Sequence, residues 1–164
     1  MENEKVDIGI FSFTGDEGCV ITLTEILNDY LFKWIDFINI KYARVLKRKN
    51  KLSKLDIAIV EGAMSSKREI DRLKDIRKNT KKLIAFGSCA IDGTPSNHRN
   101  FFEDEERQQE ISYVLEHFDL NKKVEPLKKF VTVDDIVPGC PIVEKAFVEL
   151  MYKYFEEFGL KVPR

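Results

Sequence analysis

Three cysteines stand beside glycine in three separate loops, and their type and placement could support metal chemistry. Cys19 lies in the sequence DEGC, Cys89 in GSCA and Cys140 in PGCP. Each loop follows a segment whose β-branched and apolar residues predict a strand. The loops that follow parallel strands gather at one edge of the sheet, so these three thiols can meet although they are far apart in the chain.

The residues around the cysteines favour thiolate ligands for a bulky inorganic group. Gly18, Gly87 and Gly139 would let the backbone approach such a group, and Ser88 adds another N–H in the second loop. Iron–sulfur clusters carry negative charge, and their potentials respond to hydrogen bonds that reach the sulfurs. Pro141 suits the first turn of a helix, which would place the Cys140 thiolate at a helix N-terminus. These features do not select the metal.

Other uses of the three thiols remain open from the residues alone. Buried cysteines often act as small hydrophobic residues with no chemical role. A structural zinc site usually has close ligand pairs such as C-x-x-C, and a thioredoxin-like site also needs a nearby second cysteine. The sequence has neither pattern.

The composition is typical of a soluble globular protein. The 164 residues are 43% hydrophobic and 34% charged, and with a net charge of −1 no global field argues for nucleic acid or a membrane surface as a partner. No apolar stretch reaches the roughly 18–20 residues that a membrane span needs. Residues 1–5 lead directly into a strand pattern and do not resemble a signal peptide. We therefore expect a cytoplasmic protein with reduced thiols and no membrane insertion.

The pattern of apolar runs predicts an α/β fold in one domain, residues 1–164. We expect a flavodoxin-like, open, mostly parallel sheet with helices on both faces. Ser66 and Glu69 form a capping-box pattern at the start of one helix. The predicted strands are 6–13, 37–40, 56–61, 83–86 and an extended segment at 130–137; the predicted helices begin near 19, at 66, near 103 and at 140 or 141.

One segment is strongly basic. Residues 41–54 hold seven Lys or Arg residues and no acidic residue. Such a run is usually a solvated edge of the protein, and a partner-docking surface is the alternative.

The order of the motifs resembles that of the small subunit of nickel–iron hydrogenases. The motifs are D-x-x-C after the first strand, Glu61-Gly62 after a middle strand, G-S-C-A-x-x-G at 87–93, and P-G-C-P at 138–141. The segment from Gly87 to Gly93 looks most like the short small subunits of soluble, NAD(P)-linked hydrogenases. The resemblance implies a flavodoxin-like domain that holds a proximal 4Fe–4S cluster, with Glu61 near the cluster.

Carried over by position, Cys19, Cys89 and Cys140 match three ligands of that cluster. The position of the remaining family cysteine is Asp16 here, and the resemblance to deazaflavin-reducing hydrogenases makes a carboxylate ligand plausible. A three-iron cluster or a ligand role for Glu17 are the alternatives, and Asp16 could instead cap the helix that follows it. For Glu61, a position at the interface with a large subunit competes with a role as an acceptor of backbone N–H groups. Arg99 is expected to orient the cluster loop or an interface carboxylate.

The resemblance implies a subunit that transfers electrons and has no catalytic residues of its own. The Ni–Fe centre is expected in a separate hydrogenase large subunit, and an NAD(P)-reducing flavin/iron–sulfur module or a ferredoxin-linked partner is expected to exchange electrons with the cluster. Two alternatives stay open. One is a flavodoxin-like electron carrier that binds flavin at the 14–18 loop, and the other is a complex I-like subunit with the same cluster site.

Overall fold

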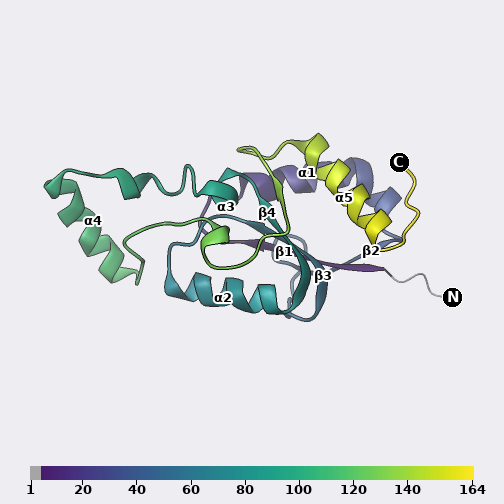
Figure 1. Cartoon of the computed structure of the whole chain (residues 1–164), viewed down its shortest axis with the longest axis horizontal. Coiled ribbons are helices and arrows are strands. Elements are labelled where there is room, and N and C mark those ends of the chain that lie inside the picture. The colour runs from purple at the N-terminus through teal and green to yellow at the C-terminus, as the bar shows by residue number, and fades with distance from the viewer. Residues whose placement is uncertain (1–4) are drawn as a thin grey trace.

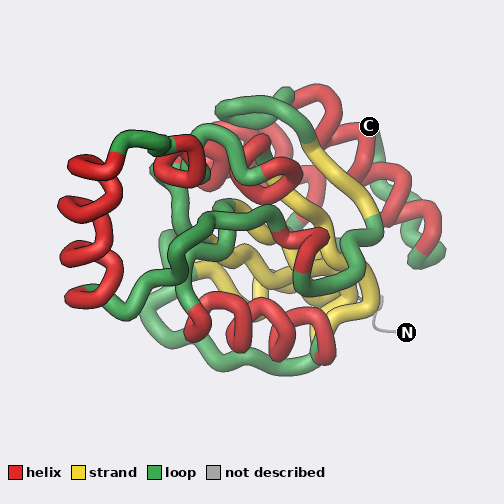
Figure 2. The backbone as a smooth tube through the Cα atoms, turned by 60° about the vertical axis from the view of Figure 1, so that its left-hand side comes forward, coloured by secondary structure: helices red, strands yellow, loops and turns green. Residues whose placement is uncertain are grey.

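The structure is a computed structural model that describes residues 5–164, so residues 1–4 of the segment considered for a signal peptide lie outside it. One five-stranded sheet has the order β2-β1-β3-β4-β5, with helices on both faces (Figures 1 and 2). The predicted fold class is confirmed. The elements are β1 Val6–Ser12, α1 Gly18–Trp34, β2 Ile38–Ala43, β3 Leu55–Glu61, α2 Lys67–Lys78, β4 Thr80–Phe86, α3 Ser88–Asp92, α4 Glu105–His117, β5 Asp135–Val137 and α5 Glu144–Glu157, with 3-10 turns at His98–Phe101 and Leu127–Lys129.

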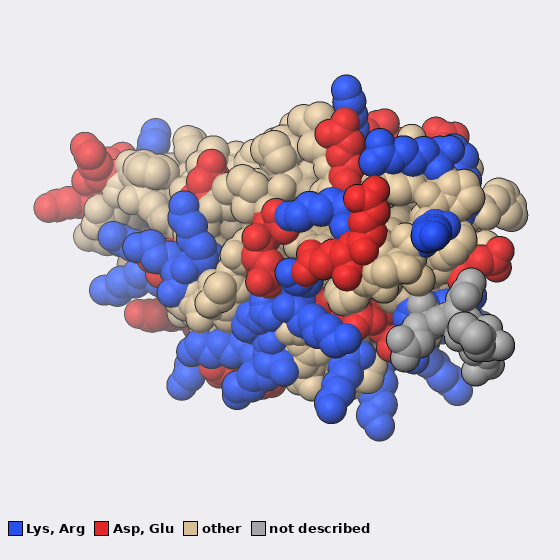
Figure 3. All heavy atoms as spheres, turned by 45° about the vertical axis from the view of Figure 1, so that its right-hand side comes forward, with Lys and Arg blue, Asp and Glu red and all other residues tan. Residues whose placement is uncertain are grey.

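All strand pairs of this sheet are parallel. The carboxyl ends of β1, β4 and β5 therefore lie at the same edge, and the loops that carry the three cysteines leave from these ends. The connection from β2 to β3 contains no helix, although helices follow β1, β3 and β4. In the connection from β2 to β3, the side chains of residues 44–49 are exposed. Lys and Arg gather along the lower side of the molecule in Figure 3, the side on which α2 lies in Figure 1.

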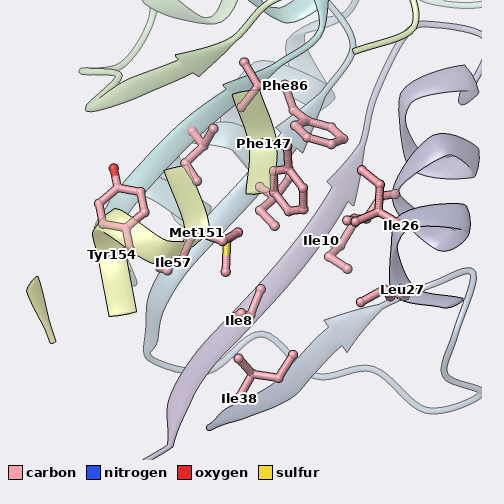
Figure 4. Packing of buried hydrophobic residues seen from close by; sticks show 14 of the residues in the cluster. Ile8, Ile10, Ile26, Leu27, Ile38, Ile57, Phe86, Phe147, Met151 and Tyr154 are labelled. Atoms are coloured by element: carbon pink, nitrogen blue, oxygen red, sulfur yellow. The ribbon is translucent and has the colours of Figure 1, made fainter. Parts of the chain in front are cut away.

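Two apolar layers cover the two faces of the sheet. On one face, α1 and α5 pack against β1 and β3, and Figure 4 shows Phe147 and Met151 of α5 over the strands that carry Ile8, Ile10 and Ile57. On the other face, side chains of α2 pack against the same strands. Because β1 and β3 are covered on both sides, their sequences are nearly continuous apolar runs rather than alternating ones.

The capping box predicted for α2 is confirmed. Ser66 Oγ accepts a hydrogen bond from Glu69 N at 3.3 Å, and Glu69 Oε2 accepts one from Ser66 N at 3.0 Å. These two bonds satisfy backbone donors that a helix N-terminus otherwise leaves free.

The prediction for the last helix was wrong. Helix α5 begins at Glu144, not at Cys140 or Pro141. Gly139 pairs with Ile142, and Val143 N donates to Pro138 O at 2.9 Å, so residues 138–143 form a tight turn before the helix. The Cys140 thiol is therefore held by a turn and not by a helix N-terminus. The prediction of an extended segment at 130–137 was also only partly right, because the strand covers only Asp135–Val137.

Helix α4 lies apart from the sheet. It has no buried residue, and it projects to one side of the molecule in Figures 1 and 2. Arg99 anchors the segment that leads to it, because Arg99 Nη2 donates to Asn121 O at 2.7 Å. Arg99 thus joins the two ends of this excursion. Among residues 5–164, no helix combines the length and the apolar character needed to cross a lipid bilayer.

Candidate metal centre

Hydrogen bonds join the three cysteine loops at the carboxyl edge of the sheet. Gly87 N donates to Val137 O at 2.8 Å and Ser88 N donates to Gly139 O at 2.9 Å, which joins the second loop to the third. Ser96 Oγ lies 3.2 Å from Cys89 Sγ and 3.3 Å from Thr14 O, which joins the second loop to the first. The structure thus brings together the loops that the sequence analysis singled out.

Gly87 makes room for the Cys19 thiol. Cys19 lies in the first turn of α1 and is only 6% exposed. A Cβ atom added at Gly87 would lie 2.4 Å from Cys19 Sγ, far inside van der Waals contact, and Gly87 has a φ of +87° that side chains disfavour. Gly87 lies in the loop of Cys89, but it therefore makes room for the sulfur of Cys19, which belongs to another loop. Gly139, in the third loop, has a φ of +120°, and a Cβ there would meet backbone atoms of Pro141 and Ile142 rather than a sulfur.

The four candidate ligands differ in exposure. Cys19 is buried, Cys89 is half-buried, and Cys140 and Asp16 are exposed. Partial desolvation, together with the nearby charges of Cys89, Asp16 and Glu61, raises the pKa of the Cys140 thiol. Cys89, Asp16 and Glu61 therefore lie within electrostatic reach of Cys140, and the site opens to the surface on the side of Cys140 and Asp16.

Burial and the Glu61 carboxylate raise the pKa of the Cys19 thiol to about 12. Without a cation, this thiol is protonated at neutral pH. A bound metal cation reverses that preference, since it attracts the thiolate and expels the proton. Burial and the charge of Glu61 thus disfavour a free, reactive thiolate at Cys19.

Glu61 holds the start of α1. Its side chain is 3% exposed and accepts hydrogen bonds from Cys19 N at 3.0 Å and from Val20 N at 3.1 Å. Burial raises the pKa of Glu61, although these two N–H groups act in the opposite direction. Of the two interpretations of Glu61, the structure favours an acceptor of backbone N–H groups, which positions Cys19.

The first turn of α1 has no N–H group left for a phosphate. Gly18 N donates to Asp16 Oδ1 at 3.0 Å, Ile21 N donates to Glu17 O, and Glu61 occupies the two N–H groups between them. Two carboxylates at this position would also repel an anion. The geometry thus disfavours a flavin phosphate at the 14–18 loop.

The candidate ligands do not surround a single metal ion. Within residues 5–164, no three His, Cys, Asp or Glu side chains stand close enough together to hold one metal ion. A structural zinc ion needs four ligands around one centre, whereas a 4Fe–4S cluster takes its four ligands at separate iron atoms and so spreads them apart.

Asp16 accepts a hydrogen bond from Gly18 N through Oδ1, and its second oxygen has no hydrogen bond from the described residues. Glu17 is exposed and has a φ of +61°.

Ser96 is a site residue that the sequence analysis did not identify. Its hydroxyl can donate to Cys89 Sγ, but it lies seven positions later, in a polar loop with no motif around it. Nothing in the residue pattern distinguishes it from other loop serines.

Comparison with known proteins gives a family match over most of the chain. The family described as "NADH ubiquinone oxidoreductase, 20 Kd subunit" matches residues 17–154. The sulfhydrogenase 2 subunit delta of Pyrococcus furiosus is 30% identical over 138 residues, which cover 82% of this chain and 55% of the relative. The NAD-reducing hydrogenase HoxS subunit delta of Cupriavidus necator is 26% identical, covering 84% of this chain and 72% of the relative.

A third relative, from the F420-non-reducing hydrogenase vhu of Methanocaldococcus jannaschii, is 28% identical and covers 96% of this chain. The chain spans 55% and 59% of the lengths of the Pyrococcus and Methanocaldococcus proteins. Among solved structures, an NAD+-reducing [NiFe]-hydrogenase in the H2-reduced state has a chain with a TM-score of 0.77 and 23% identity, covering 98% of this chain and 96% of that one. That likeness establishes a shared fold.

Proposed function

Because the chain belongs to the NADH ubiquinone oxidoreductase 20 kDa subunit family, we propose that it is an electron-transfer subunit with one 4Fe–4S cluster. Cys19, Cys89, Cys140 and Asp16 would hold the four iron atoms. The observation that carries this proposal is the convergence of the three cysteine loops, with Cys19 Sγ seated in the space that only a glycine at position 87 leaves open. When bound, the cluster would supply one-electron chemistry.

We propose further that the chain works within a nickel–iron hydrogenase. It would relay electrons between the Ni–Fe centre of a separate large subunit and an NAD(P)- or ferredoxin-linked partner. The relatives named as hydrogenase subunits support this assignment, and the NAD-reducing hydrogenase subunit among them supports an NAD(P)-reducing partner module.

The exposed side of the site favours coverage by another subunit. Cys140 and Asp16 are exposed there, and Ile21 and Val143, which follow the first and third cysteine loops, are 57% and 51% exposed. We infer from these exposed ligands and apolar side chains that a partner covers this side of the site. The large subunit is the partner that this surface would contact.

The carboxylate ligand is tested by replacing Asp16. Asp16→Ala should change the EPR spectrum of the reduced cluster and its midpoint potential, because one iron atom loses its anionic protein ligand. Asp16→Cys should keep four irons and give the spectrum of a cluster with four cysteine ligands. Asp36→Ala removes an exposed carboxylate elsewhere and serves as the control. If the spectrum and potential of Asp16→Ala equal those of the native chain, Asp16 is not a ligand.

Ser96 should adjust the cluster potential without binding iron. Its hydroxyl lies 3.2 Å from Cys89 Sγ, and a donor near a ligand sulfur stabilises the more negative, reduced cluster. Ser96→Ala should keep the iron content and lower the midpoint potential by about 40 mV, if the bond is worth about 1 kcal/mol. A redox titration followed by EPR measures the shift, and Ser112→Ala, on α4, is the control. An unchanged potential would show that the hydroxyl serves Thr14 O instead.

A further inference from the structure

A hollow of about 540 Å³ lies on the face of the sheet that α2 covers. It opens where no helix follows β2, because the connection from β2 to β3 is a loop. Its lining comes from the ends of β1 and β2, from Arg44 just after β2, and from the first turns of α2. These residues have no part in the proposed cluster site.

Two stacked aromatic rings contribute to the lining of the hollow. The rings of Phe11 and Tyr42 stack with their centroids 4.5 Å apart, and the Arg72 guanidinium lies 5.6 Å from the centre of the Tyr42 ring. Ser12 Oγ, also in the lining, is buried and has no hydrogen-bond partner among the described residues. A buried hydroxyl without a hydrogen-bond partner is uncommon in folded proteins.

Three arginines give the hollow a positive charge. Arg68 and Arg72 lie one helical turn apart on the same face of α2, and Arg44 joins them from the β2–β3 connection. None of the three forms an ion pair with a carboxylate within residues 5–164. Glu69 is the one acidic residue of the lining, and its two oxygens already accept hydrogen bonds from Thr14, Ser65 and Ser66.

We propose that this hollow binds a small organic phosphate with at least two negative charges. The planar guanidinium presents paired N–H donors that match the oxygens of a phosphate group, and no carboxylate within residues 5–164 pairs with these three arginines in competition with such an anion. The size of the hollow lies within the range of about 300–1,000 Å³ found for small-molecule sites, and its lining is mainly polar. An acidic peptide would instead need a long open groove. The site neither requires the cluster nor depends on a hydrogenase partner.

Binding of inorganic pyrophosphate to the full chain, measured by isothermal titration calorimetry, tests this site. The double variant R68Q/R72Q should weaken pyrophosphate binding by about tenfold or more, because two charge-assisted contacts are lost. The matched control is K67Q/K74Q, which removes the same charge from exposed positions of the same helix, outside the lining. This control should change the Kd less than twofold. Circular dichroism checks that the variants are folded.

A second pair of variants tests the same site if the double variant does not fold. Arg44→Gln should weaken pyrophosphate binding severalfold, whereas Arg48→Gln, in the same loop but outside the lining, should not. The site is overturned if the native chain does not bind pyrophosphate, or if the lining variants and their controls lose affinity equally, which would indicate general attraction to a basic surface. Tighter binding of a poly-glutamate peptide, lost in R68Q/R72Q, would also overturn it in favour of an acidic partner segment.

Discussion

Gly87→Ala should lose most of its bound iron, although Gly87 is not itself a ligand. The new Cβ would lie 2.4 Å from Cys19 Sγ, so the thiol must move away from its place at the site. The backbone adds a second cost, because a φ of +87° with a ψ of 163° is a conformation that non-glycine residues adopt only at about 1–3 kcal/mol. The combination of steric displacement and strain should reduce both iron content and stability.

Gly159→Ala separates the two causes. Gly159 also has a positive φ, +76°, but a Cβ there would have no atom within 4 Å. This variant should share part of the strain and keep its iron. The comparison is made by iron analysis of both variants after reconstitution, with circular dichroism as the test of folding. Equal iron in the two variants would mean that Cys19 Sγ does not need the space beside Gly87.

Glu61→Ala should be the most destabilising side-chain change at the site. It leaves Cys19 N and Val20 N buried without an acceptor, and it removes a negative charge from the N-terminus of α1. Each orphaned buried donor costs about 1–3 kcal/mol, so the loss of two acceptors should lower the free energy of unfolding by about 2–6 kcal/mol. Because Cys19 begins this helix, its thiol loses its fixed position and iron binding should weaken as well.

Urea unfolding, together with iron analysis, measures both effects. Glu61→Gln keeps one acceptor oxygen and should fall between the native chain and Glu61→Ala. Glu25→Ala, on the exposed side of α1, should change neither quantity. If Glu61→Ala unfolds at the same urea concentration as the native chain, then the hydrogen bonds from Cys19 N and Val20 N to Glu61 do not stabilise the fold.

The sequence predicted the framework of the site because its signals are local. The apolar runs marked the four longer strands at or near their observed positions, and the Ser66–Glu69 capping box marked the start of α2 correctly. The glycine beside each cysteine pointed to close approach at the sheet edge. A parallel sheet then brings the loops together wherever they lie in the chain.

What the sequence could not predict depends on contacts between distant segments. Proline after Cys140 is compatible with a first helical turn, but pairing of Gly139 with Ile142 makes a turn there instead. Ser96 reaches Cys89 only through the path of its loop, and Gly87 serves the sulfur of Cys19, a residue of another loop. Likewise, the basic run at 41–54 gave no sign that Arg44 would face Arg68 and Arg72 across a hollow.

Iron and acid-labile sulfide, counted per full chain after anaerobic reconstitution, test the central claim most directly. The proposal predicts about four irons and four sulfides per chain, with a reduced-state EPR signal that disappears in Cys19→Ala and Cys140→Ala. A yellow, iron-free protein that retains flavin would contradict it and favour a flavodoxin-like carrier.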